Sequence, residues 1–284
     1  MTKLLVLIDG SVYTQSVCDH AAWVAERTDA TIDLLHVLGR RAVSSVPADL
    51  SGNLDADARD TLLEELVSMD EQQAKLAQKR GRLILEQAKA RLTDAGITAV
   101  TTRLRNGDLL ETVQEFEAEA NLIMIGKRGE AADFASLHLG SNLERVVRAS
   151  HKPVLVASRA FKPVGSFLIA YDGGPSADKA VDHIAGGHLF PGIPCRLLMT
   201  GNPNDAMRAK LDAAAAKLRT AGYDVTAGIV PGQPDAAIAE TVEKEGIGLL
   251  VMGAYGHSRI RTLIIGSTTT EMVRSCRIPV MLFR

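Results

Sequence analysis

The chain repeats one pattern of apolar runs and helix-like segments twice, and this repeat constrains its fold more than any other feature. Strand-like runs alternate with helical periodicity in each copy, which is the pattern of a parallel α/β sheet. We therefore expect two tandem α/β domains of five parallel strands each, spanning 1–160 and 161–284. The repeated landmarks pair Asp9 with Asp172, Gly107 with Gly232, Gly126 with Gly253, Gly129 with Gly256, and Gly140-Ser141 with Gly266-Ser267.

The first copy is longer than the second. The interval from Asp9 to Gly126 exceeds the interval from Asp172 to Gly253 by about 36 residues, and the surplus falls mostly in 39–80. The pattern predicts a loop followed by a charged helical insertion. Gly81 interrupts that helix, so we expect a bend or two consecutive helices. The charges favour a solvated face, and a helix that binds a partner is the alternative.

Composition limits the classes of function. The 284 residues carry a formal net charge of only −2, with 46% hydrophobic and 4% aromatic side chains. Neither a basic excess nor aromatic platforms suggest nucleic acid. The apolar run after Lys3 is too short for a signal peptide or a membrane span. The three cysteines lie far apart, as expected for a reduced, cytoplasmic protein without a disulfide framework or zinc knuckle.

A glycine-rich stretch lies between the apolar run 247–252 and the last helix-like segment. Its glycines allow backbone amides to approach a ligand, and its hydroxyls fall where a helix N-terminus presents unpaired N–H groups. An arginine adds positive charge, so phosphate is the natural ligand. The alternative is that the glycines turn the chain and the serine caps the helix. The candidate phosphate-binding residues are Gly253, Gly256, Arg259, Gly266, Ser267 and Thr268.

This stretch matches the motif Gly-x2-Gly-x9-Gly-Ser/Thr, and with the Pro231-Gly232 turn and the closing run 278–283 the chain resembles a tandem universal stress protein. The resemblance implies a Rossmann-like five-stranded parallel sheet in each half with strand order 3-2-1-4-5. It also implies that the halves pair through their fifth strands, 154–157 against 280–283, as a pseudo-dimer within one chain. The nucleotide crevice would lie at the carboxyl ends of strands 1 and 4, where open parallel sheets bind ligands.

Some members of this family bind ATP, and the resemblance assigns roles to the second half. Asp172 would lie at the adenosine or metal end of the ligand, where magnesium is the candidate ion. Met199 and Thr200 would contact adenine through their backbone. The alternative for Asp172 is a helix cap. Gly232 would let the backbone approach the ligand, although a plain turn explains it nearly as well.

The first half departs from the motif, because ten residues instead of nine separate Gly129 from Gly140. Its loop also carries Glu130 and Asp133, which repel phosphate, against Lys127 and Arg128, which attract it. We therefore expect a weaker second site here. Its candidate residues are Asp9, Val37, Gly126, Gly129, Gly140 and Ser141.

The leading hypothesis is a cytoplasmic stress-response sensor or regulator that binds ATP or another adenine nucleotide mainly in its second half. The alternative is an interaction scaffold that binds no nucleotide. A slow ATPase ranks third, because the sequence contains no Gly-x4-Gly-Lys-Ser/Thr loop and no kinase signature. We assign no catalytic residue, and we expect protein partners or a further homodimer but neither nucleic acid nor membrane as a partner.

Overall fold

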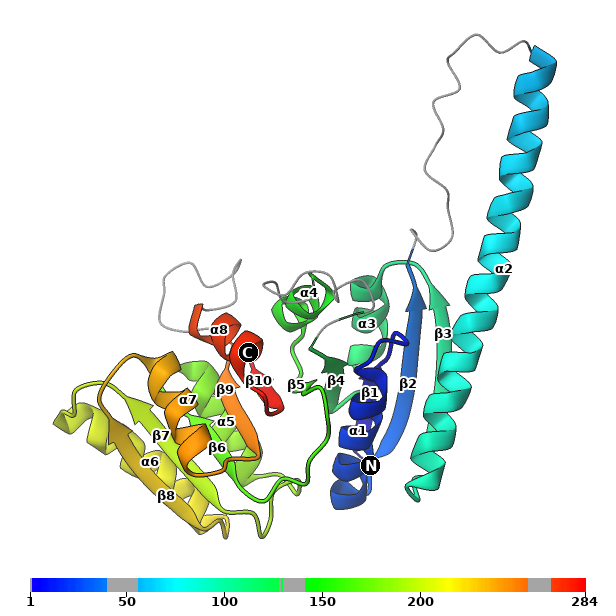
Figure 1. The fold of residues 1–284 in the computed structure, drawn as a ribbon. Coiled ribbons are helices and arrows are strands. Elements are labelled where there is room, and N and C mark those ends of the chain that lie inside the picture. The colour runs from blue at the N-terminus through cyan, green and yellow to red at the C-terminus, as the bar shows by residue number, and fades with distance from the viewer. Residues whose placement is uncertain (1, 40–55, 128, 130–140, 255–266) are drawn as a thin grey trace.

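The computed structural model describes residues 2–39, 56–127, 129, 141–254 and 267–284. Ten strands form a single sheet in the order β3-β2-β1-β4-β5-β10-β9-β6-β7-β8 (Figure 1). Each half therefore has the strand order 3-2-1-4-5, which confirms the expected fold. The order reverses between the first and fourth strands of each half, and this reversal positions the candidate sites.

In the described residues of the first half, five parallel strands alternate with four helices. The strands are β1 (Lys3–Leu7), β2 (Thr31–Leu38), β3 (Val100–Asn106), β4 (Leu122–Gly126) and β5 (Val154–Ala157). The helices are α1 (Thr14–Thr28), α2 (Ala56–Asp94), α3 (Leu109–Glu117) and α4 (Ser141–Ala149).

The second half repeats this succession with a shorter second helix. Its strands are β6 (Phe167–Ala170), β7 (Cys195–Thr200), β8 (Val225–Val230), β9 (Leu249–Gly253) and β10 (Val280–Phe283). Its helices are α5 (Pro175–Ala185), α6 (Asp205–Thr220), α7 (Pro234–Lys244) and α8 (Ser267–Ser275).

The halves join through their fifth strands. β5 and β10 pair antiparallel, with Leu155 opposite Met281 at the centre of the short ladder. The expected pairing through the fifth strands is confirmed. It covers two sheet edges that separate halves would leave open to other chains.

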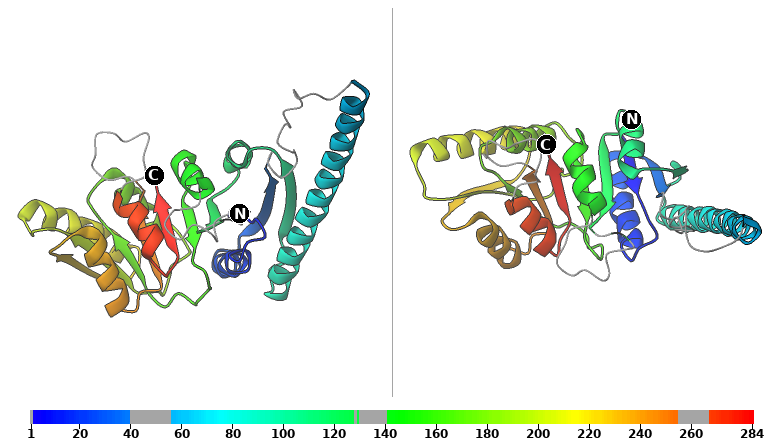
Figure 2. Two further views of the ribbon diagram at one scale, coloured as in Figure 1. Left: turned by 45° about the horizontal axis from the view of Figure 1, so that its top comes forward. Right: turned by 90° about the horizontal axis from the view of Figure 1, so that it is seen from above.

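Helices cover both faces of the sheet, which explains why its strands are continuously apolar (Figure 2). Leu4 and Val6 point to the face covered by α1, α2, α5 and α6, whereas Leu5 and Leu7 point to the face covered by α3, α4, α7 and α8. Each hydrophobic cluster runs through both halves. The two repeats therefore share one continuous core layer on each side.

The expected interruption of the charged helix at Gly81 is wrong. α2 runs unbroken from Ala56 to Asp94 over 39 residues. Gly81 is buried against the sheet, where an added Cβ would lie 2.7 Å from Leu104 Cδ1 and 3.0 Å from His36 Cδ2. The glycine therefore permits close packing of α2 on β2 and β3 instead of breaking the helix.

Within the described ranges, none of the helices has the length and apolar character needed to cross a membrane.

Candidate functional site

The strand ends of the second half converge on one edge of the sheet. β6 pairs in parallel with β9, with Ala170 opposite Met252, and β7 pairs with β8, with Thr200 opposite Val230. Asp172, Gly253 and Gly232 follow or end these strands. The chain order reverses between β6 and β9, so Asp172 and Gly253 lie on the two sides of the switch point.

Asp172 holds the turn that follows β6. Its Oδ1 accepts the N–H of Gly174 at 2.8 Å, and Gly173 between them has φ +69°, a conformation that favours glycine. Gly174, and not Asp172, occupies the N-cap position of α5. Asp172 is therefore a turn-forming carboxylate at the sheet edge, which argues against the sequence alternative of a plain helix cap.

Lys210 of α6 lies over the same turn. Its Nζ donates to the Gly173 carbonyl at 3.1 Å, and its Cδ would lie 2.8 Å from a Cβ on Gly173. This ammonium group brings positive charge to the turn that follows β6. Sequence analysis missed it, because a lysine in a helix carries no motif and reaches this turn only through the packing of α6 beside α5.

Gly253 ends β9 directly against the first turn of α5. A Cβ on Gly253 would lie 3.0 Å from the Cβ of Ser176 and 3.5 Å from the backbone nitrogen of Ala177. Thr269 Oγ1 donates to the Gly253 carbonyl at 3.1 Å, which ties the start of α8 to the same strand end. Two helix N-termini, with their partial positive charge, thus meet the end of β9.

The other candidates of the second half differ in what they present. Met199 is buried with its side chain in the core, so only its backbone is available for a contact, whereas Thr200 is half-buried. Gly232 has φ +122°, and an added Cβ would meet no described atom within 4 Å. Its glycine is thus required by backbone conformation and not by crowding within the protein.

Part of the predicted phosphate loop lies outside the described residues, namely Gly256, Arg259 and Gly266, together with Gly140 of the first half. The helices that follow begin at Ser267 and Ser141, as expected for N-terminal hydroxyl residues. Thr268 is half-buried in the first turn of α8.

The first half builds a similar edge with different chemistry. Asp9 Oδ1 accepts the N–H of Ser11 at 3.0 Å, repeating the Asp172 turn, while Gly126 ends β4 and the half-buried Val37 lies in β2. Gly10, the counterpart of Gly173, packs against Ile84 of α2, whose Cδ1 would lie 2.6 Å from an added Cβ. An apolar side chain here takes the place of Lys210.

Lys127, expected to favour phosphate in the first half, instead makes a contact between the halves. Its Nζ donates to the Cys276 carbonyl at 2.8 Å, at the C-terminus of α8. Arg284 makes the reciprocal contact, donating to the Arg148 carbonyl of α4 at 2.7 Å. Both cations lie at the negative end of a helix in the opposite half.

Tyr171, beside the second site, is a buried phenol. Burial, followed by a 2.6 Å hydrogen bond to Asp178, raises the pKa of the Tyr171 phenol well above its usual range. Tyr171 is therefore a neutral donor that fixes α5 to the end of β6, beside Asp172. In the described part of the chain, no three His, Cys, Asp or Glu side chains gather as a metal site, and all three cysteines are buried and free.

Comparison with known proteins gives consistent matches over the whole chain. The sequence model of the universal stress protein family matches residues 1–158 and 196–284. The chain is 37% identical to universal stress protein Slr1230 of Synechocystis over 287 residues, covering 100% of both. It is 24% identical to a universal stress protein of Mycolicibacterium smegmatis, covering 99% of this chain and 96% of the relative. A crystal structure of a universal stress protein from Archaeoglobus fulgidus has the same fold, with TM-score 0.73 at 20% identity over 99% of this chain and 98% of that chain.

Proposed function

Because the chain belongs to the universal stress protein family, we propose that it is a cytoplasmic stress-response protein whose second half binds ATP or a related adenine nucleotide. The observation that carries the proposal is the meeting of Asp172 and Gly253 at the switch point of β6 and β9. Open parallel sheets bind ligands at this place. Binding there would report nucleotide state to the rest of the molecule.

The phosphate end of the ligand is proposed to lie over the end of β9. Packing at Gly253 is tight, because an added Cβ would lie 3.0 Å from the Cβ of Ser176, and α5 and α8 both begin there. Backbone amides at helix N-termini favour anions. The motif residues Gly256, Arg259, Gly266, Ser267 and Thr268 are the proposed phosphate contacts.

The adenosine end is proposed to lie towards β6 and β7. Asp172 offers a carboxylate for a ribose hydroxyl, and the backbone at Met199 and Thr200 offers polar groups to the adenine edge, with Gly232 beside them. Lys210 adds positive charge near the turn. Magnesium, when bound, would take oxygen ligands from Asp172, phosphate and water, because a lone carboxylate fills only one or two of its six positions.

The first half is proposed as the weaker site. Ile84 occupies the place of Lys210, and the Lys127 ammonium donates a hydrogen bond to the Cys276 carbonyl. Each difference lowers the attraction for a polyphosphate. Any ATP hydrolysis is proposed to be slow, because the sequence contains no Gly-x4-Gly-Lys-Ser/Thr loop and no kinase signature.

Calorimetric titration with ATP and magnesium, on protein first shown to be free of nucleotide, tests the proposal. We expect one site per chain, abolished by Gly266→Glu and retained in the matched first-half variant Gly140→Glu. Each substitution adds bulk and negative charge at the equivalent loop position. Loss of binding only in Gly140→Glu would move the site to the first half, and no binding by folded wild-type protein would reject the nucleotide function.

The interaction scaffold is the second candidate, and one observation favours it. α2 is 39 residues long, whereas its counterpart α6 has 16, and the additional turns extend beyond the sheet (Figure 1). A binding surface on α2 is compatible with nucleotide binding in the second half, because the two lie at different ends of the sheet.

A further inference from the structure

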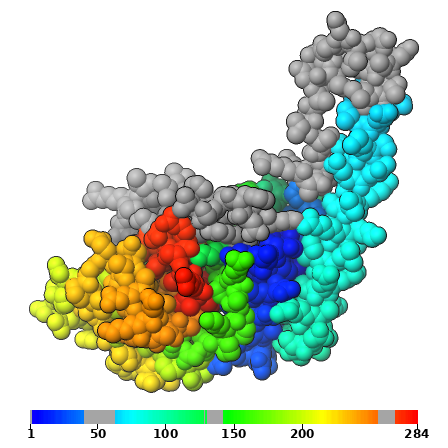
Figure 3. All heavy atoms as spheres, in the orientation of Figure 1, coloured from blue at the N-terminus to red at the C-terminus, as the bar shows by residue number. Residues whose placement is uncertain are grey.

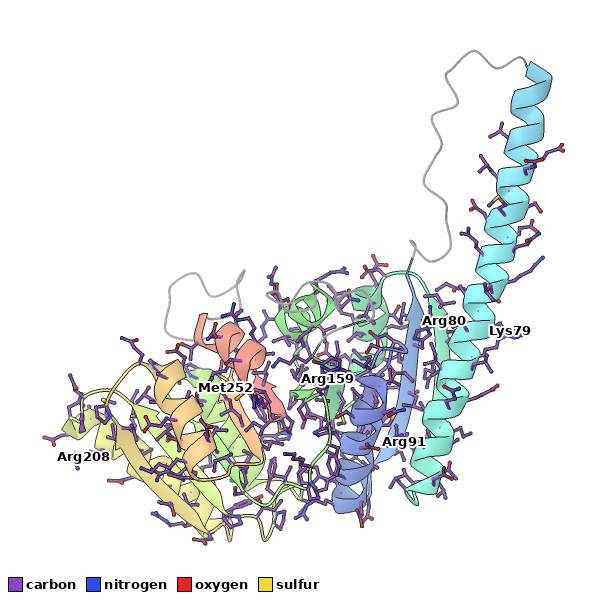
Figure 4. All side chains as sticks on the ribbon, viewed as in Figure 1. Lys79, Arg80, Arg91, Arg159, Arg208 and Met252 are labelled. Carbon is purple, nitrogen blue, oxygen red and sulfur yellow. The ribbon has the colours of Figure 1, made fainter. Side chains whose placement is uncertain are left out.

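α2 consists of an anchored part and a projecting arm. From Gly81 onwards it packs on the first half through Leu85, Ala88 and Leu92. The Arg91 guanidinium, on the part of α2 that lies beside α1 (Figure 4), binds both carboxylate oxygens of Asp19 at 2.6 and 2.8 Å. Before Gly81 the helix rises away from the rest of the molecule (Figures 1 and 3). Packing on the sheet therefore does not explain the apolar side chains of the arm.

Among the exposed apolar side chains of α2, Leu63 and Val67 lie on one side of the helix, and three others form a row on the other side, which we call the outer stripe. Met69 is 55% exposed, Leu76 67% and Leu83 48%. They recur every seven residues, and Leu62 continues the interval in the sequence. Leu85 lies nine residues from Leu76, about half a turn around the helix, so the outer stripe is on the face opposite the packed one.

A seven-residue apolar interval fills one of the two positions, a and d, that form a coiled-coil seam. The positions four residues after Met69 and Leu76 are polar, Gln73 and Arg80. An α-helix that keeps a seven-residue interval drifts by about 20° per heptad, and a slight left-handed supercoil removes this drift. The outer stripe extends from the arm into the anchored part of α2, since Leu83 lies beyond Gly81. A second helix thus meets a row of apolar side chains that faces away from the sheet.

Charge along α2 is divided between its two ends. From Asp57 to Glu71 the helix carries six acidic side chains and one basic one, whereas from Lys75 to Arg91 it carries six basic and one acidic. A parallel pair of such helices would place like charges together. An antiparallel pair places each acidic end beside a basic end.

We propose that the outer stripe binds the same stripe of a second copy of this chain, forming an antiparallel homodimer through α2. Met69 and Leu83 are equally far from Leu76, so a two-fold axis near Leu76 places Met69 beside Leu83 of the second copy and the two Leu76 side chains together. The charge pattern matches itself under the same rotation. Such an isologous contact closes as a dimer and does not propagate.

Sedimentation equilibrium tests the association. We expect wild-type protein to dimerise, with a dissociation constant that rises with salt concentration because opposite charges flank the seam. Leu76→Glu brings two carboxylates together at the axis and is expected to weaken the dimer at least tenfold. Val67→Glu makes the same kind of change at a side chain that is 59% exposed. Val67 lies nine residues before Leu76, about half a turn around the helix from the outer stripe, so this variant serves as the matched control.

Disulfide trapping tests the orientation. The native cysteines are buried, so any cross-link between chains is expected to form through the cysteines introduced on α2. We expect Leu76→Cys to cross-link with itself, and Met69→Cys to cross-link with Leu83→Cys when the two variants are mixed. Dominant Met69→Cys self-cross-linking would indicate a parallel pair and overturn the proposal, as would a wild-type monomer at all concentrations. Titration of Leu76→Glu with ATP distinguishes a failure of the dimer proposal from a failure of the proposed nucleotide function. The variant is expected to bind ATP as the wild type does.

Discussion

The Asp9 carboxylate lies so close to Gly129 that a Cβ added to this glycine would be 2.9 Å from Asp9 Oδ2. β1 and the segment after β4 therefore converge at the switch point of the first half, as in a nucleotide crevice. The second half has a carboxylate at the same place, Asp172. The difference in charge between the halves therefore comes from Lys210 beside the second turn, where the first half has Ile84.

The repeat provides a matched pair of variants for the carboxylates at the switch points. Asp172→Asn is expected to raise the Kd for ATP about 10-fold or more, since a hydrogen bond to a charged group contributes about 1.5–3 kcal/mol. Asp9→Asn is expected to leave this Kd unchanged. Isothermal titration of both variants checks the assignment, and equal losses would contradict a preference for the second half.

Lys127 is expected to stabilise the contact between the halves and not to bind ligand. Lys127→Met removes its hydrogen bond to the Cys276 carbonyl and a cation from the C-terminus of α8, so we expect about 1 kcal/mol lower free energy of unfolding. Urea denaturation measures this, with the exposed Lys89→Met as control. A large loss of ATP affinity in Lys127→Met would instead place its ammonium in a ligand site.

Glu117 predicts how stability depends on pH. Burial raises the pKa of its carboxyl, but hydrogen bonds from Ser150, His151 and Lys152 outweigh this and lower it overall. When the pKa of a carboxyl is lower in the folded than in the unfolded protein, its charge stabilises the fold at pH values above the unfolded pKa. This stabilisation is lost as the pH falls through the folded pKa.

Urea denaturation at pH 7 and pH 4 therefore separates the charge of Glu117 from its size. Glu117→Gln is expected to lower the free energy of unfolding by about 2 kcal/mol at pH 7, with a smaller difference from wild type at pH 4. The isosteric amide keeps the volume of the side chain. A difference that stays constant between the two pH values would contradict the proposed role of the charge.

The repeat made the sheet predictable from sequence. Repeated residues such as Asp9 and Asp172 mark the ends of apolar strands in each half. Apolar strands that alternate with amphipathic helices are compatible with only a few sheet topologies. The resemblance provided the strand order and the pairing of β5 with β10, and both are confirmed. Local periodicity alone would not have shown that the two halves share one sheet.

Contacts between elements distant in sequence were not predictable. Lys210 reaches the Gly173 turn from another helix, and Lys127 contacts the opposite half. The packing of the helices and strands, and not the spacing of residues in the sequence, determines which atoms the end of a long side chain contacts. The roles assigned to Asp172 and the glycine loop remain predictions. They depend on a ligand, about which strand and helix patterns carry no direct information.

Gly81 shows the same limit and provides the last prediction. In an exposed helix interior, replacing glycine by alanine stabilises by about 1 kcal/mol. Here the new methyl group would meet Leu104 Cδ1 at 2.7 Å and His36 Cδ2 at 3.0 Å. We expect Gly81→Ala to lower the free energy of unfolding by about 1–3 kcal/mol, the usual cost of overpacking, and the exposed Gln87→Ala to change it little. Equal or higher stability of Gly81→Ala in urea would show that α2 can move away from β2 and β3 at no cost.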